Sequence, residues 1–338
     1  MTVRYRTLGN TGVQVSRFGL GTMVLGVWGN RDLAECARII QRAIDAGINL
    51  IDTADVYGAG ENELIVGRAI AGRRDDILLA TKFHGAMGDD VNRQGNSRRW
   101  VMRAIDESLR RLDVDHVDLY QIHRPDPATP IEETVGALDD LVRAGKIRYW
   151  GTSTFPAAEI VEARTAAARR SATGPHTEQP PYSILCRHIE REVLPVCQRH
   201  GIGVLTWSPL SGGWLTGKYR AAGDAPEGSR AATNPEHFDG DNHAKAAAVD
   251  RLRSVAEQAG LPLAHLALAW AAEHPVVSSV LIGPRTDEQL IDLLEAIDVK
   301  LDTDTLDAID EIVAPGTNLN PADAGWTPPG LDPNARRR

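Results

Sequence analysis

The sequence lacks the hydrophobic segments that mark membrane insertion or export. No apolar run approaches the roughly 20 residues that cross a bilayer. The first ten residues, MTVRYRTLGN, contain no apolar core of a signal peptide. With 42% apolar and 25% charged residues, the composition is that of a globular protein with a sizeable core. These features predict a protein that does not interact with membranes, and we expect a cytoplasmic location.

Cysteines are few and positive charge is not concentrated. Cys36, Cys186 and Cys197 show no metal-ligand spacing and cannot all pair, so we expect free thiols in a reducing compartment. The 46 acidic and 37 basic residues give a formal net charge of −9, and the basic residues are scattered apart from the final RRR. Nucleic-acid binding needs a clustered basic face, so no nucleic-acid partner is expected.

Several motifs of metal and cofactor sites are also missing. The sequence contains neither an HExxH motif nor a CxxC cluster, and it lacks a carboxylate cluster for a divalent ion, so no metal is expected. No Gly-x-Gly-x-x-Gly sequence follows the first predicted strand, which argues against a Rossmann domain. No nucleophilic serine or cysteine motif stands beside a base.

What the sequence does contain is a regular alternation of short apolar runs with longer amphipathic ones. The apolar runs are nearly uniform in character, as in strands covered on both faces, and the sixth is assigned mainly by its place in the series. The predicted strands are 17–21, 47–51, 76–81, 117–122, 146–150, 175–179, 203–207 and 276–282. Helical periodicity is clearest over 98–112, 131–145, 191–201 and 250–260.

This alternation predicts an α/β fold built from parallel strands. Eight strand–helix units favour a closed (β/α)8 TIM barrel, with a doubly wound open sheet as the alternative. We expect one barrel domain over residues 1–316, preceded by an N-terminal β-hairpin that turns at Asn10–Gly12. A long loop should follow the seventh strand over 217–242, and the Pro-rich tail 317–338 should be poorly ordered.

Polar residues follow the predicted strands at the same end. Asp52 and Tyr57 come after the second strand, Lys82 after the third and His123 after the fourth. A barrel gathers its strand C-termini at one mouth, where active sites lie. Each residue alone has an ordinary explanation, such as a helix cap for Asp52 or a solvent-reaching chain for Lys82. Their occurrence together at one end favours a functional site.

The chemistry of these four side chains suits proton delivery to a carbonyl oxygen. A phenol with a pKa of about 10 is a weak acid, and a neighbouring ammonium such as Lys82 favours its phenolate. Asp52 would keep Lys82 charged and oriented, because an isolated buried ammonium is costly. His123 would bond the substrate oxygen or the phenol of Tyr57. A hydride cofactor best supplies the missing reactant.

At these residues the sequence resembles the aldo-keto reductase family, in the branch of the potassium-channel β-subunits and bacterial reductases. The matching blocks include NLIDTADVYGAGENELIVGRAI, VDLYQIHRPD, LTWSPLSGGWLTGKY and IGPRTDEQL, and they extend over roughly residues 4 to 300. The resemblance implies a barrel that binds NADPH and reduces an aldehyde or ketone. It further implies that Tyr57 is the general acid, tuned by Lys82 and Asp52, while His123 orients the carbonyl.

The resemblance also implies an NADP(H)-binding set. Ser153 and Gln179 would hold the nicotinamide carboxamide, Trp207 would stack on the ring, and Gly283, Arg285 and Gln289 would reach the adenosine 2′-phosphate. The other implied cofactor residues are Gly21, Thr22, Met23, Asp52, Thr154, Ser208, Pro209, Leu210, Gly212 and Lys218. The small-molecule carbonyl pocket would be lined by Trp28, Tyr57, Phe83, His84 and His123.

Two positions depart from the family pattern. Thr154 replaces a common Asn after the fifth strand, and Leu293 replaces an Asn that contacts adenine. An alternative function is an NADPH-binding regulatory subunit that docks on a partner protein. The complete set of four residues, and a predicted barrel that starts almost at once, favour catalysis. A third, weaker reading is a sugar-phosphate or metal-dependent barrel enzyme. The sequence predicts no oligomeric state.

Overall fold

Eight parallel strands close into a barrel. The computed structural model describes residues 4–220, 223–233 and 242–331. The strands pair in the order β10-β3-β4-β5-β6-β7-β8-β9, which is the predicted (β/α)8 barrel and not an open sheet. They are β3 (Phe18–Gly21), β4 (Leu50–Asp52), β5 (Leu78–Phe83), β6 (Val117–Ile122), β7 (Ile147–Thr152), β8 (Thr177–Glu178), β9 (Gly203–Thr206) and β10 (Val277–Ile282).

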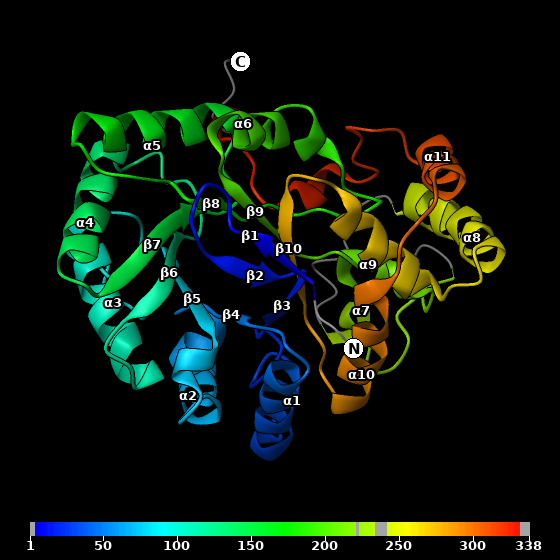
Figure 1. The fold of residues 1–338 in the computed structure, drawn as a ribbon, viewed down its shortest axis with the longest axis horizontal. Helices are drawn as coiled ribbons and strands as arrows, with labels where there is room; N and C mark the ends of the chain where they lie inside the picture. The colour runs from blue at the N-terminus through cyan, green and yellow to red at the C-terminus, as the bar shows by residue number, and fades with distance from the viewer. Residues whose placement is uncertain (1–3, 221–222, 234–241, 332–338) are drawn as a thin grey trace.

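Helices surround this barrel on all sides (Figure 1). The longer ones are α1 (Leu33–Asp45), α2 (Glu61–Ala69), α3 (Arg98–Leu112), α4 (Ile131–Arg143), α5 (Ala157–Arg169), α6 (Val193–His200), α8 (His243–Gln258), α9 (Leu263–Glu273), α10 (Asp287–Glu295) and α11 (Thr303–Ile312). No helix within the described ranges combines the length and apolarity needed to cross a membrane.

The sequence of α3 illustrates how each helix is defined locally. The helix begins after Ser97, whose hydroxyl accepts the backbone N–H of Trp100, and it ends at Asp113 in the left-handed conformation with φ of 54°. Val101 and Ile105 lie four residues apart and are buried, as an amphipathic helix packed on a sheet requires.

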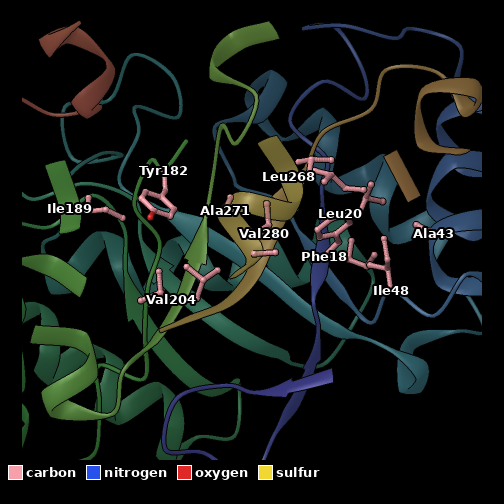
Figure 2. Close-up of a cluster of buried hydrophobic side chains, with 14 of the residues drawn as sticks. Phe18, Leu20, Ala43, Ile48, Tyr182, Ile189, Val204, Leu268, Ala271 and Val280 are labelled. Atoms are coloured by element: carbon pink, nitrogen blue, oxygen red, sulfur yellow. The ribbon is translucent and has the colours of Figure 1, made fainter. Parts of the chain in front are cut away.

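The main core lies between the outer faces of the strands and the inner faces of the helices (Figure 2). Phe18 and Leu20 of β3 and Val280 of β10 are fully buried in this layer, among residues of the helix ring such as Ala43 of α1. Burying side chains of this size contributes about 1.5–3 kcal/mol each. This layer therefore holds the strands in the register that aligns their C-terminal ends.

The predicted N-terminal hairpin is formed by β1 (Tyr5–Thr7) and β2 (Gln14–Ser16). It overlies the centre of the barrel in Figure 1. Leu8 and Val15 of this hairpin join a second apolar cluster, whose barrel members are Leu50, Ala80, Leu119, Leu205 and Leu281. The hairpin therefore closes the end of the barrel at which the strands begin, and the opposite end remains for a site.

The loop expected over 217–242 contains a short helix, α7 (Arg230–Thr233), and residues 221–222 and 234–241 lie outside the described part. The predicted tail also differs from expectation over residues 317–331, which have defined contacts with the barrel. The backbone N–H of Leu319 donates to the Leu185 carbonyl, and Asp323 forms an ion pair with the buried Lys245. Residues 332–338 are outside the described part.

Candidate active site

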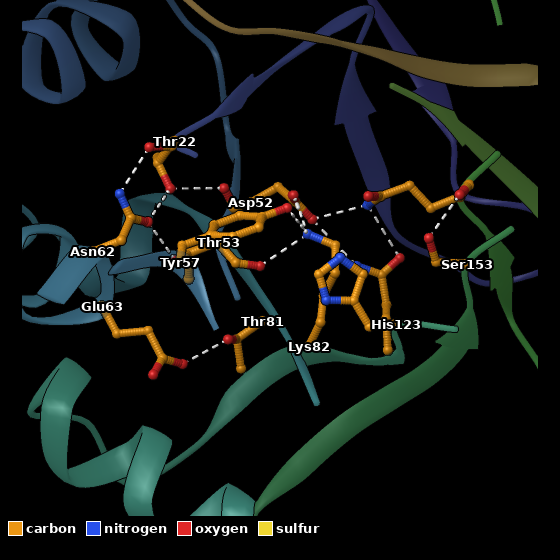
Figure 3. Close-up of polar contacts among 12 residues, drawn as sticks. Thr22, Asp52, Thr53, Tyr57, Asn62, Glu63, Thr81, Lys82, His123 and Ser153 are labelled. Atoms are coloured by element: carbon orange, nitrogen blue, oxygen red, sulfur yellow. Dashed lines mark hydrogen bonds and ion pairs between the residues drawn. The ribbon is translucent and has the colours of Figure 1, made fainter. Parts of the chain in front are cut away.

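The polar residues expected at the strand ends do meet at one mouth of the barrel (Figure 3). Asp52 ends β4, and Lys82 lies inside β5, where it pairs with Gln121 of β6. We expected Lys82 just beyond its strand, but β5 continues to Phe83. Because side chains alternate along a strand, Lys82 points into the barrel and Phe83 points outward.

A buried ion pair lies at the centre of this mouth. The Lys82 ammonium bonds the Asp52 carboxylate and also donates to the Thr53 carbonyl oxygen at 2.9 Å. The Lys82 side chain is 0% exposed. Its Nζ lies 3.4 Å from the phenolic oxygen of Tyr57 in η1 (Tyr57–Gly60). The carboxylate, the ammonium and the phenol therefore form one continuous network.

The electrostatics of the network keep Lys82 charged and Tyr57 neutral. Burial by itself lowers the pKa of Lys82, but the charge and hydrogen bond of Asp52 outweigh it, so the pKa is raised. Burial raises the pKa of Tyr57, and the nearby Lys82 opposes this only in part. We expected the ammonium to make the phenol more acidic. Lys82 acts in that direction, but desolvation is stronger, and the phenol stays protonated at neutral pH.

His123 and Trp28 contact the phenol ring from two sides. The His123 ring centre lies 5.8 Å from that of Tyr57 in an edge-on arrangement, and the Trp28 ring centre lies 5.7 Å away. Burial, followed by the charges of Lys82 and Arg124, holds the pKa of His123 well below its usual range. The imidazole is therefore neutral, and Trp28, which is 48% exposed, lies at the rim.

Three amide side chains support this network: Gln179, which the sequence had indicated, and Gln121 and Asn62, which sequence reasoning missed. Gln179 and Gln121 donate to the second oxygen of Asp52 at 2.9 and 3.2 Å. Asn62 of α2 donates to the Thr22 carbonyl at 2.7 Å and accepts the Thr53 hydroxyl at 2.6 Å. Gln121 could have been found, because it is the one amide in the apolar run 117–122 and it lies at the inward position opposite Lys82.

Ser153 and Thr154 follow β7 in a turn that depends on β8. The Ser153 hydroxyl donates to the Gln179 carbonyl at 2.9 Å, and the Thr154 N–H reaches the same oxygen. Thr154 has φ of 62°, a left-handed conformation that is unfavourable for a β-branched residue. Glu178, fully buried, accepts the Thr152 hydroxyl and the Phe155 N–H and so holds both ends of the turn.

The remaining predicted cofactor residues lie along β9, β10 and the loops that follow them. Trp207, Ser208, Pro209 and Leu210 come directly after β9, and Gly212 lies in η4 (Ser211–Thr216). Lys218 is exposed as a whole, but the end of its side chain packs against Gly213, where an added Cβ would come within 2.6 Å of its Cε. The charges of Arg285 and Arg230 act on Lys218: burial lowers its pKa, and the two guanidinium groups lower it further.

Arg230 was also missed, because it stands in a loop with no periodic pattern. Gln289, predicted to contact a phosphate, accepts the Arg285 N–H at 2.8 Å and so fixes the turn that presents Arg285. Asp292 contacts the buried His265, 3.1 Å away, and Leu293 is buried in the core. The apolar side chain of Leu293 thus cannot form the adenine contact that an Asn would make at this position.

The first strand delivers its predicted residues to the same mouth. Gly21 pairs with Asp52 across β3 and β4, and the Thr22 N–H donates to the Asp52 carbonyl at 2.9 Å. Met23 follows and is partly exposed. A Cβ at Gly19 would approach Leu281 within 2.8 Å, whereas one at Gly21 would meet nothing closer than 3.5 Å. Close packing therefore disfavours a side chain at position 19 but not at position 21.

One predicted pocket residue lies elsewhere. Phe83 is fully buried in the outer core, with its ring 4.8 Å from that of Tyr120, so its assignment to the substrate pocket was wrong. His84 remains near the mouth, and its Nδ1 lies 3.0 Å from the Asn96 side-chain oxygen. The pocket residues that do surround the phenol are thus Trp28 and His123.

Comparison with known proteins agrees with this geometry. The chain is 41% identical over 326 residues to a protein of Arabidopsis thaliana named a probable voltage-gated potassium channel subunit beta, covering 92% of this chain and 97% of that one. It is 37% identical over 335 residues to the uncharacterized oxidoreductase YrpG of Bacillus subtilis, covering 96% and 100%. The sequence profile of the aldo/keto reductase family matches residues 17–314. A matching profile over nearly the whole barrel, around a mouth that unites Asp52, Tyr57, Lys82 and His123, means that this chain belongs to the aldo/keto reductase family of oxidoreductases.

Proposed function

We propose that this protein binds NADPH and reduces an aldehyde or ketone to an alcohol. The observation that carries the proposal is the contact of a neutral, partly buried phenol with an ammonium that is itself fixed by a carboxylate. A protonated phenol beside a cation can give a proton to an oxygen that becomes negative, because the cation stabilises the phenolate that remains.

The residues present fit the nicotinamide cofactor. Lys218, Arg230 and Arg285 gather positive charge on a chain whose net charge is −9, as binding of phosphates requires. Gln179 uses its side-chain amide N–H groups toward Asp52 and Gln121. Its Oε1 makes no hydrogen bond within the described residues and is suited to a carboxamide N–H. NADPH, when bound, supplies the hydride.

The roles of this chain's own residues follow from their contacts. Tyr57 gives its phenolic proton to the substrate oxygen, and Lys82 stabilises the phenolate that results. Asp52 keeps the ammonium charged, and the side-chain amides of Gln121 and Gln179 hold the Asp52 carboxylate in place. The neutral His123, whose ring stands edge-on to the phenol, aligns the same substrate oxygen.

A second function is supported by the comparisons alone. Relatives at 40% and 41% identity bear the name of a channel β-subunit, so an NADPH-binding subunit that docks on a partner protein is the alternative. Such a subunit would bind the cofactor at the same mouth but turn over slowly. The rate of NADPH oxidation therefore distinguishes the two functions.

The test is NADPH oxidation, followed at 340 nm, across a panel of aldehydes, ketones, quinones and sugars. We expect turnover with at least one class. Tyr57→Phe should retain NADPH binding by fluorescence titration and lose at least about 100-fold in reduction, the contribution expected of a general acid. Equal rates in the parent and this variant would remove Tyr57 as the proton donor. Tight NADPH binding without turnover of any class would favour the regulatory function.

A further inference from the structure

Arg124 is a cation of the mouth that the reduction chemistry does not use. It follows His123 at the end of β6 and is partly buried. Its guanidinium carbon lies 5.8 Å from the centre of the Trp207 ring, and one Nη donates to the His123 carbonyl oxygen at 2.6 Å. Stacking and one backbone bond hold the group in place but engage only one nitrogen of a five-donor guanidinium.

Arg124 has no carboxylate partner at contact distance in the part of the chain that the structure describes. Among the described residues, no acidic oxygen lies within the 4.0 Å of an ion pair with it. Its electrostatic neighbour Glu178 is already engaged, since the two carboxylate oxygens accept the Thr152 hydroxyl and the Phe155 N–H. Burial lowers the pKa of Arg124, which reflects the free energy of desolvating its charge. A partly desolvated cation without a counter-ion is stabilised by a ligand of opposite charge.

Arg124 lies at the part of the mouth where the substrate would bind. The charge of Arg124 acts on the phenol of Tyr57, and the two residues that contact Arg124, His123 and Trp207, border the same mouth. Lys218, Arg230 and Arg285 act on one another, and Arg230 also acts on the phenol of Tyr57. Arg124 differs from them in its contacts, because it bonds the His123 carbonyl and stacks on Trp207 at the end where the carbonyl would react.

We propose that Arg124 binds a carboxylate of the substrate, so that the preferred substrates are small aldehydes or ketones that carry a carboxylate near the carbonyl. This inference rests on the proposed carbonyl reduction and specifies its substrate class. A planar guanidinium with free N–H donors matches a carboxylate in a two-bond geometry.

The test compares two aldehydes that differ only in the carboxylate, succinic semialdehyde and butanal, with the full-length protein and NADPH. We expect the parent to prefer the carboxylated aldehyde in kcat/KM by at least tenfold. Arg124→Gln should lose about 10- to 100-fold with succinic semialdehyde, because a hydrogen bond to a charged group contributes that much, and less than threefold with butanal. Arg124→Lys, which keeps the charge, should recover part of the loss.

A binding measurement separates this inference from the proposed reaction. Calorimetry with the two alcohols, 4-hydroxybutanoate and 1-butanol, needs no turnover. We expect the parent to bind 4-hydroxybutanoate more tightly, and Arg124→Gln to bind both equally weakly. An equal loss with both aldehydes, or equal binding of both alcohols by the parent, would overturn the role of Arg124. Absence of turnover together with a carboxylate preference would reject the reductase function and retain the anion site.

Discussion

The Lys82 ammonium lies 3.4 Å from the phenolic oxygen of Tyr57; the ammonium is fully buried and the phenol is partly buried. Two opposing effects meet at this contact. Desolvation raises the pKa of the phenol, and the ammonium lowers it. The balance leaves the pKa of Tyr57 above its ordinary value of 10, so that the proton is held until an acceptor stronger than water approaches.

This balance predicts the pH dependence of reduction. The active form has a protonated Tyr57, and this form is lost only as pH rises through a pKa above 10. The rate of carbonyl reduction at saturating NADPH should therefore be flat between about pH 6 and 9 and should fall at higher pH. A steady fall across this neutral range would show that a different group supplies the proton.

Replacing Lys82 should slow reduction, because the phenolate of Tyr57 loses its stabilising cation, and should also lower the unfolding free energy of the protein. Lys82→Met leaves the buried Asp52 without its partner, which typically costs about 3–5 kcal/mol of unfolding free energy. The double variant Asp52→Asn, Lys82→Met removes both charges and serves as the control. We expect the double variant to regain stability in urea unfolding but to remain at least about 100-fold slower in reduction. Recovery of the rate along with stability would mean that Lys82 only supports the fold.

Cofactor preference should depend on Arg285. Arg285→Ala removes one of three clustered cations. The affinity that is lost should be the part contributed by the 2′-phosphate, which distinguishes NADPH from NADH. We expect NADPH to bind about 10- to 100-fold more weakly in fluorescence titration and NADH to change less than threefold. Gln289→Ala, which releases the Arg285 backbone, should give a smaller effect in the same direction. An unchanged NADPH-to-NADH ratio would dismiss the assignment.

A paired substitution separates the core from the pocket. Phe83→Ala removes a fully buried ring that packs on Tyr120 and should lower the unfolding free energy by about 3–5 kcal/mol. Trp28→Ala removes an exposed rim residue and should leave the unfolding midpoint nearly unchanged while raising KM for apolar aldehydes. The opposite result, a stable Phe83→Ala with a raised KM, would return Phe83 to the pocket.

The contrast between Lys82 and Phe83 shows what a sequence can and cannot reveal. The near-uniform apolar runs predicted all eight strands, and polar residues at their ends predicted the mouth. The sequence pattern places Lys82 just after the third run, although β5 continues through it to Phe83. Because the predicted strand lies two residues too early in the sequence, the two-residue alternation is not applied to Phe83 and cannot assign it to the outer face.

Contacts between distant segments are the other feature that a local reading of the sequence does not reveal. The Pro-rich composition of residues 317–338 predicts a poorly ordered tail, and within its described part Asn318 accepts the His188 N–H at 2.9 Å, a contact across 130 positions. Arg230 likewise becomes a candidate phosphate ligand only because its charge acts on Lys218 together with that of Arg285, and these two residues lie elsewhere in the sequence. Composition and periodicity describe local preference, and these positions are determined by partners far along the chain.

The last prediction concerns Glu178, the buried carboxyl beneath the turn of Ser153 and Thr154. Burial raises its pKa from 4.5 to about 7. Because the folded-state pKa is the higher one, the folded protein binds more protons between these values. Its stability is then greatest below about pH 4.5 and declines as pH rises to about 7. The interval from 4.5 to about 7 corresponds to about 3 kcal/mol at about 1.4 kcal/mol for each pH unit.

Glu178→Gln should abolish this dependence, since the amide oxygen can still accept the Thr152 hydroxyl or the Phe155 N–H but has no charge to desolvate. Urea unfolding of the parent and the variant at pH 5 and pH 8 measures the difference. From pH 5 to pH 8, the unfolding free energy of the variant relative to that of the parent should rise by up to about 3 kcal/mol. Glu159→Gln, on the partly exposed face of α5, is the matched control and should gain far less. The same gain in both variants would mean that general surface charge, and not the buried carboxyl under the turn, governs stability in this pH range.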